Sequence, residues 1–270
     1  MRIQLAVVTA LVVALAGCAV TPTDISDMSR AAAEYKRGSD GAARVIVARL
    51  MGQKRSDPGR AALVLQSVCM PAHKFKDASE LASRALSVAD KSKLEGMAEL
   101  YTVLGMAKHE MGDTDGAIAA YKEALRNRGD DHTAMNNLGY AYAEVPPAGA
   151  NLAEALELTT RAVKLARRRG VPDAQVGVFM DSVGWVQYRM GRSDEAIVTL
   201  TEAVELCPTQ ADVPYHLARA YLAVGRRGDA VVMLRRARAM SPGLDAANRL
   251  LDSLLADTGA PAETTAPGRP

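Results

Sequence analysis

Small residues recur along this chain at a fixed spacing, within segments whose apolar side chains repeat every three to four positions. Gly105, Gly139, Gly184 and Ala218 occupy one such position and are separated by 34, 45 and 34 residues. Each of these segments is followed by a second apolar segment that carries alanines. A period near 34 residues predicts a stack of helix-turn-helix units, because one hairpin alone cannot bury its apolar face.

Four units of this pattern are expected between residues 98 and 244. In the most regular unit the first helix ends at Gly191, and the second stops before Pro208. The four units are 98–131, 132–176, 177–210 and 211–244. Within each, the two helices are expected to cross closely, with Gly184 and Ala196 supplying small side chains at the crossing. Larger residues such as Tyr121 and Leu200 would fill the space between neighbouring hairpins.

The unit 132–176 is longer than the others by eleven residues. Four extra residues fall in the turn 145–151, and seven more follow the second helix around 169–172. A surface loop that tolerates length explains the insertion. We favour that explanation, and a docking loop is the alternative, because rigid scaffolds often carry binding residues on such insertions.

Regions outside the four units show weaker patterns. Residues 26–97 are expected to form degenerate helical repeats, and 245–256 a single capping helix. The tail 257–270 is rich in Thr, Ala, Pro and Gly and has no large apolar residue, so we expect it to be disordered. The predicted fold is an all-α, right-handed α-solenoid with a C-terminal capping helix.

The first residues have the pattern of an export signal. Arg2 precedes an apolar run over 3–16, which is too short to span a bilayer. Leu15-Ala16-Gly17-Cys18 resembles the lipobox of bacterial lipoproteins, and an ordinary signal with an incidental cysteine is the alternative. The resemblance implies a signal peptide over 1–17, a lipidated Cys18 at the start of a tether over 18–25, and a membrane anchor. With Ala19 after the cysteine, it also implies the outer membrane, facing the periplasm, if the source is Gram-negative.

Composition and motifs exclude several classes of function. The chain has 33 basic and 31 acidic side chains, so charge gives no reason to expect a nucleic-acid partner. The four histidines lack the spacing of metal ligands, and there is no Gly-x-Ser-x-Gly, phosphate loop or Cys-x2-Cys. We therefore expect no enzyme activity, no metal and no cofactor. Cys69 and Cys207 lie three repeats apart and are expected to be free thiols.

The repeats resemble the tetratricopeptide repeat family, whose units read Trp-x2-Leu-Gly-x2-Tyr followed by Ala, an aromatic residue, Ala and Pro. Lys108 and Gln187 depart from this pattern where it has Tyr, and Met135 and Pro214 where it has Trp. The runs 136–140 and 181–185 look like those of bacterial tetratricopeptide lipoproteins. That group includes adaptors for periplasmic proteases and factors for pilus or envelope assembly.

The resemblance also implies a binding surface, because the first helices of this family line a concave groove. The side chains at the matching positions are Asn136, Tyr140, Asp181, Trp185, Tyr188, Arg189, Tyr215 and Arg219. Aromatic residues and arginine are typical of interface anchors. Packing of Trp185 and Tyr188 between repeats is the alternative. The paired lysines of carboxylate-clamp domains are absent, so a chaperone C-terminal tail is not implied.

These observations favour a membrane-anchored scaffold or adaptor that binds partner proteins or peptides in the bacterial cell envelope. A structural assembly factor for pili, secretion or exopolysaccharide export is the alternative, and self-association stays open. The identity of the partner is not encoded in these patterns.

Overall fold

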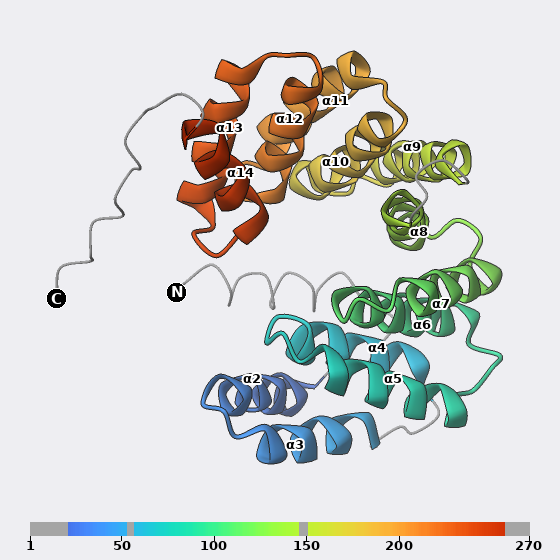
Figure 1. Ribbon diagram of the computed structural model, residues 1–270. Coiled ribbons are helices and arrows are strands. Elements are labelled where there is room, and N and C mark those ends of the chain that lie inside the picture. The colour runs from blue at the N-terminus through green and yellow to red at the C-terminus, as the bar shows by residue number, and fades with distance from the viewer. Residues whose placement is uncertain (1–20, 53–56, 146–150, 257–270) are drawn as a thin grey trace, which may run out of the picture. The chain divides into compact units, whose positions relative to one another are not determined.

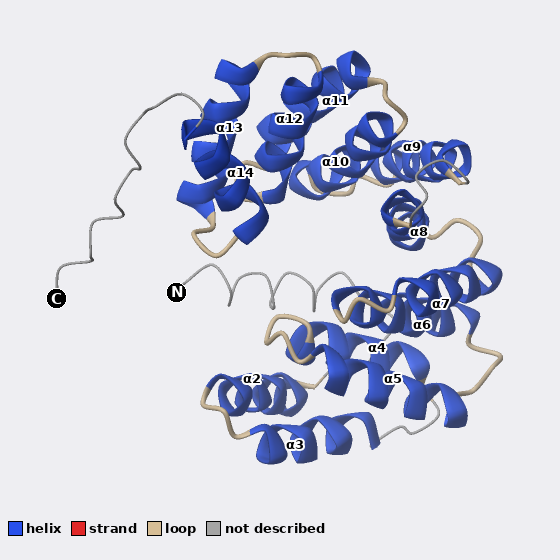
Figure 2. Cartoon of the chain, viewed as in Figure 1, coloured by secondary structure: helices blue, strands red, loops and turns tan. Residues whose placement is uncertain are grey.

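The computed structural model describes residues 21–52, 57–145 and 151–256. Within these ranges every regular element is a helix and no strand occurs (Figure 2), which confirms the all-α fold class. The helices in chain order are α2 (Pro22–Lys36), α3 (Asp40–Gly52), α4 (Pro58–Val64), the π-helical turn η1 (Leu65–Cys69), α5 (Phe75–Val88), α6 (Leu94–Glu110), α7 (Thr114–Asn127), α8 (His132–Glu144), α9 (Leu152–Arg168), α10 (Asp173–Arg189), α11 (Ser193–Leu206), α12 (Asp212–Ala223), α13 (Arg227–Met240) and α14 (Asp245–Ala256) (Figure 1).

The chain divides into two compact units, residues 1–141 and 142–270. In the first unit α2 packs on α3, and α6 packs against α4, α5 and α7. Long aliphatic side chains that are fully buried form its core, among them Leu50, Leu63 and Leu100. The helices of this unit therefore stack as successive hairpins around one continuous apolar interior.

The second unit repeats this arrangement with its own core. Here α10 packs against α9, α11 and α12, and α13 packs against α12 and α14. Leu200, Leu234 and Leu251 are fully buried. Leu251 belongs to α14, which covers the last hairpin.

A residue in the left-handed backbone region closes the turn inside five of the hairpins. It always lies five positions before a fully buried alanine of the second helix. These residues are Gly38 (φ 79°), His73 (φ 55°), Gly112 (φ 80°), Gly191 (φ 76°) and Gly225 (φ 76°). Glycine adopts this conformation without strain. Because His73 replaces it in the hairpin of α4 and α5, the most visible turn signal is missing there from the sequence.

The glycines at the helix crossings face large side chains. A Cβ atom on Gly184 would lie 2.5 Å from Leu200 Cγ, and one on Gly105 would overlap the ring of Tyr121. Leu200 and Tyr121 come from the second helix of the same hairpin. The prediction placed both side chains between neighbouring hairpins. It left out that each also fills the space next to the glycine of its own hairpin. Ala196, predicted at the same crossing, is fully buried.

The N-terminal tether predicted over 18–25 differs from the structure. Thr21 is the N-cap of α2 and forms a capping box with Asp24, and Pro22 takes the first helical turn. Asp24 is buried and pairs with Arg60 of α4 at 2.6 Å. Residues from 22 onward are therefore part of the packed fold, because a buried ion pair holds them.

Other predicted segments lie outside the described residues. They are the signal peptide 1–17, the lipidated Cys18, residues 146–150 of the long turn and the tail 257–270. Within the described ranges no helix is both long and apolar enough to cross a bilayer. Cys69 and Cys207 are buried free thiols, and burial raises the pKa of each to about 11.

Candidate functional site

Six of the eight predicted groove residues meet in the second unit, on helices α10 and α12. They form one network together with two residues that the prediction omitted, Glu144 and His216. We call this set the aromatic–arginine cluster: Glu144, Asp181, Trp185, Tyr188, Arg189, Tyr215, His216 and Arg219.

Helical spacing brings these side chains to one face of each helix. On α10, residues 181, 185 and 188 follow each other at intervals of four and three, and on α12 residues 215 and 219 are four apart. The two helices are the first helices of successive hairpins and pack against each other. Their matching faces therefore meet, and the cluster is held on rigid elements.

Trp185 forms the centre of the cluster and is only 6% exposed. Its ring stacks on Tyr188 with 5.1 Å between centroids, and on His216 with 4.4 Å. The indole Nε1 donates a hydrogen bond of 2.6 Å to Glu144 Oε1. Trp185 is therefore held by a hydrogen bond and by two stacked rings, and it packs beneath the half-buried residues Tyr188 and Arg219.

His216 and Asp181 form a buried polar pair beneath the tryptophan. The distances from His216 Nδ1 to the two carboxylate oxygens are 2.9 and 3.0 Å. An ionised carboxylate only accepts hydrogen bonds, so Nδ1 is the nitrogen that carries a proton. Burial alone would lower the pKa of His216, but the attraction of Asp181 and the hydrogen bond to it outweigh burial and raise that pKa.

Arg219 lies among the half-buried residues at the rim of the cluster. Its Nη1 donates to the Tyr215 hydroxyl at 2.9 Å, and its Nη2 donates to the Tyr188 hydroxyl at 3.1 Å. The Arg219 Cζ lies 5.4 Å from the ring of Tyr188 and 5.9 Å from the rings of Trp185 and Tyr215. Burial works to lower the pKa of Arg219, but the two hydroxyls raise it overall. The guanidinium is thus a fixed cation in an aromatic setting.

Arg189, also half-buried, has a carboxylate partner. Its Nη1 lies 3.4 Å from Glu144 Oε1, the same oxygen that accepts the indole N–H. Its Cζ lies 5.7 Å from the Trp185 ring. Glu144 therefore ties Arg189 and Trp185 into one arrangement.

The other two predicted residues, Asn136 and Tyr140, belong to the first unit and to α8. Asn136 is 4% exposed, and its Nδ2 lies 3.4 Å from Asn137 Oδ1. Tyr140 is half-buried and packs edge-on against His109 of α6, with 5.7 Å between ring centroids. Asn136 is thus an interior residue, and Tyr140 contributes to the surface of the first unit.

Sequence reasoning missed Glu144 and His216 for different reasons. Glu144 occupies the thirteenth position of the unit 132–176, the position that Arg189 holds in the next unit. The repeat register therefore contained the signal for Glu144. His216 lies at a position that the family pattern does not assign to the groove. Only the packing of α12 on α10 brings it onto Trp185.

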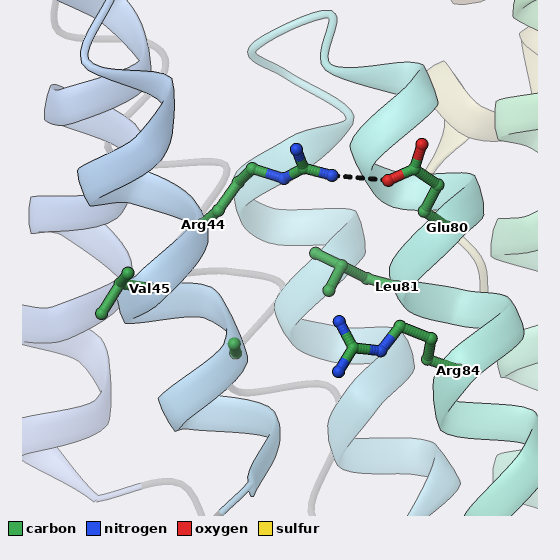
Figure 3. A pocket seen from close by; sticks show the side chains of 6 residues that line it. Arg44, Val45, Glu80, Leu81 and Arg84 are labelled. Carbon is green, nitrogen blue, oxygen red and sulfur yellow. Dashed lines mark hydrogen bonds and ion pairs between the residues drawn. The ribbon is translucent and has the colours of Figure 1, made fainter.

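A second feature lies in the first unit, between α3 and α5. Arg44, Val45, Ala48, Glu80, Leu81 and Arg84 line an open hollow of about 200 Å³ (Figure 3). Arg44 already binds Glu80 at 2.5 Å and Asp77 at 3.3 Å. Arg44 thus already has two carboxylate partners. In the described ranges no group of three His, Cys, Asp or Glu residues could hold a metal ion.

The stacked hairpins define a helical-repeat protein. Two segments, residues 98–131 and 187–256, match models of the tetratricopeptide repeat. Over these two segments the chain consists of tetratricopeptide repeats, as the sequence pattern predicted.

The chain is also similar to solved structures of tetratricopeptide proteins. TTC0263, a thermophilic tetratricopeptide protein of Thermus thermophilus, is 20% identical, with a TM-score of 0.57 over 75% of this chain and 99% of that chain. YrrB, described as a tetratricopeptide protein with an unusual peptide-binding site, is 21% identical, with a TM-score of 0.48 over 76% and 97%. At these identities the likeness to TTC0263 shows the shared fold. A comparison with curated proteins gave no match.

Proposed function

We propose that this protein is a non-enzymatic scaffold that binds a partner protein or peptide on the rim of the aromatic–arginine cluster. The rim consists of Tyr188, Arg189, Tyr215 and Arg219, all half-buried. The observation that carries the proposal is that Arg219 is fixed between two tyrosine hydroxyls above a buried tryptophan. Tyrosine and arginine dominate the energetic centres of protein interfaces.

Preorganisation is the physical advantage of this surface. A side chain that is immobilised only on binding costs about 0.5–1.5 kcal/mol of entropy. Here Arg219 is held by two hydrogen bonds, and Tyr188 is stacked on Trp185. Much of that ordering has therefore taken place before the partner arrives.

Site-specific photo-crosslinking in living cells tests the proposal. A photoreactive phenylalanine analogue would replace Tyr188 or Tyr215, and Tyr221 would serve as the matched control. Tyr221 is also half-buried, lies on α12 like Tyr215, and has Arg226 4.4 Å from its ring. Discrete protein adducts are expected from positions 188 and 215 but not from 221. Adducts from 221 alone would overturn the proposal, and adducts to a second copy of the chain would favour the structural assembly role.

Affinity for the crosslinked partner then measures the energetic role of the rim. Tyr215→Ala should weaken binding by at least 2 kcal/mol if it is a hot spot, which is roughly thirtyfold. Tyr221→Ala should leave the affinity unchanged. Trp185→Ala is a poorer test, because this buried ring also supports the packing of α10 on α12. Equal affinities for the Tyr215 and Tyr221 variants would place the contact elsewhere.

We further propose that a lipid on Cys18 holds the scaffold in the bacterial cell envelope. The support is the Leu15-Ala16-Gly17-Cys18 sequence at the end of the apolar run. Multiple acyl chains give stable anchoring, whereas one chain is marginal. Cys18→Ala should release the protein from the membrane fraction, whereas Ala19→Ser, which keeps the cysteine, should not. If Cys18→Ala stays in the membrane fraction as the parent protein does, the proposed lipid anchor is wrong.

A further inference from the structure

One cation of the aromatic–arginine cluster, Arg219, has no carboxylate partner among the described residues. Arg189 is paired with Glu144 at 3.4 Å, and His216 is paired with Asp181 at 2.9 Å. Arg219 forms no ion pair with any carboxylate in the described part of the chain. Its two hydrogen bonds go to neutral tyrosine hydroxyls.

From this we propose that the partner presents a carboxylate to Arg219, so that the scaffold recognises an acidic side chain or a free C-terminus. The proposal rests on the binding role given above to the rim. A guanidinium has five N–H donors, and the tyrosines occupy two of those of Arg219. The donors that remain suit a carboxylate, which guanidinium groups bind in a planar, often bidentate geometry.

The local charge favours a monoanion over a polyanion. The other cation of the rim, Arg189, is already neutralised by Glu144, and Asp212 adds a further negative charge near His216. A phosphate group or a polyanionic surface would meet only one uncompensated positive charge here. One carboxylate matches that charge.

The tyrosine hydroxyls set the direction from which the carboxylate binds. Tyr188 and Tyr215 take one N–H from each of the two terminal nitrogens of Arg219, and they come from different helices. Neighbouring rings lower the cost of keeping the guanidinium partly buried. Loss of either hydroxyl would free the guanidinium to turn, so Tyr188→Phe and Tyr215→Phe are expected to weaken carboxylate binding less than removal of the charge.

The test uses the full chain in detergent micelles and an array of random twelve-residue synthetic peptides. Peptides selected by the parent protein are remade with each Asp or Glu changed to its amide, and separately with an amidated C-terminus. We expect one of these two changes to weaken binding by about 10- to 100-fold, the range for losing a charge-assisted hydrogen bond. A loss of affinity on changing Asp or Glu to its amide would indicate a side-chain carboxylate. A loss of affinity on amidating the C-terminus would indicate a C-terminal carboxylate.

Protein variants complete the experiment. Arg219→Gln removes the charge, and Arg168→Gln is the control, because Arg168 is an exposed arginine of α9 in the same unit. Arg219→Gln should lose the same 10- to 100-fold, with no further loss when the peptide is neutralised as well. Arg168→Gln should bind as the parent does. If Arg219→Gln fails to fold, the neutralised peptides on the parent protein decide the question alone.

Three outcomes overturn the inference, and they differ in whether the proposed function of the rim also fails. Peptides that compete with crosslinking at Tyr215 but bind equally well when neutralised would overturn the carboxylate and leave the binding rim in place. Preference for phosphorylated over carboxylate peptides would do the same. If no peptide in the array competes with crosslinking at Tyr215, both the carboxylate proposal and the proposed function of the rim are overturned.

Discussion

Each unit of the protein buries one charged or titratable pair that links the first helices of successive hairpins. In the first unit Arg60 of α4 pairs with Asp24 of α2, 36 residues earlier, at 2.6 Å. In the second unit His216 of α12 pairs with Asp181 of α10, 35 residues earlier, at 2.9 Å. The two pairs use the same architecture, and they differ in chemistry and in surroundings.

The pair of the first unit is permanently charged and closed to solvent. The side chains of Arg60 and Asp24 are 5% and 2% exposed, and Arg60 Nε also donates to the carbonyl of Leu50. Bonds from Arg60 and Thr21 outweigh the effect of burial and lower the pKa of Asp24. This pair therefore stays ionised at neutral pH and joins α2 to α4 and to the end of α3.

The pair of the second unit contains a histidine whose pKa is raised by Asp181, and it adjoins Tyr188 and Arg219 through Trp185. The comparison teaches that the position of a buried pair in a repeat array does not define its role. A pair without an exposed neighbour acts as a structural link. A titratable pair that contacts a tryptophan next to half-buried residues also contributes to the electrostatics of the proposed binding surface.

The largest expected effect comes from breaking the first pair. Arg60→Met leaves the Asp24 carboxylate buried without its partner and should lower the free energy of unfolding by about 3–5 kcal/mol. Arg49→Met is the matched control. Arg49 also links α2 to another helix, through Asp27 at 2.6 Å, but its side chain is 52% exposed. Its loss should cost under about 1 kcal/mol.

Denaturant unfolding followed by circular dichroism measures both variants. Similar losses for Arg60→Met and Arg49→Met would show that burial does not separate the two ion pairs. The double variant Arg60→Met with Asp24→Asn should recover part of the lost stability, because no unpaired charge remains.

A smaller effect tests whether the helix crossings of the two units are equivalent. Gly184→Leu should overpack the contact with Leu200 and lower the free energy of unfolding by about 1–3 kcal/mol. Gly105→Leu should act similarly in the first unit, where the ring of Tyr121 occupies the space. Gly228→Leu is the control, because a Cβ on Gly228 would meet nothing within 4 Å. An unchanged denaturation midpoint for Gly184→Leu would show that the crossing is not close.

The repeat pattern was sufficient to predict the fold class and the family, because small residues at helix crossings are a local signal with a fixed period. It was weaker upstream, where His73 stands in place of the turn glycine and η1 inserts a π-helical turn. The spacing from Gly38 to His73 is 35 residues, whereas the turn glycines of the last two hairpins, Gly191 and Gly225, are 34 residues apart.

The candidate site was predictable as a set of positions but not as a set of contacts. The register placed Trp185, Tyr188, Tyr215 and Arg219 on first helices, and the structure joins them. Which of them is buried depends on how α12 packs on α10, and a sequence pattern contains no such distance. The burial of Trp185, on which the rings of Tyr188 and His216 stack, is the clearest example.

The smallest expected effect is the pH response of the second pair, and the solitary tryptophan of the chain reports it. The pKa of His216 is raised in the folded state, so its contribution to stability is fully present below about pH 6.5 and is lost as pH rises through the folded pKa. The negative groups that act on it are Asp181, Asp212 and Glu144. The free energy of unfolding should therefore fall as the pH rises above about 6.5.

Global unfolding alone cannot isolate this effect, because burial also raises the pKa of Glu99, in the first unit, to about 7. A carboxyl group with a raised pKa makes stability fall between about pH 4.5 and 7, so the two windows adjoin. Trp185 fluorescence separates them, since a protonated imidazole stacked at 4.4 Å quenches the indole. The emission of the folded protein should increase with a midpoint above pH 6.5, unchanged in Glu99→Gln and absent in His216→Gln. A midpoint below 6.5 would mean that burial outweighs Asp181, and the His216 imidazole would then be uncharged at physiological pH.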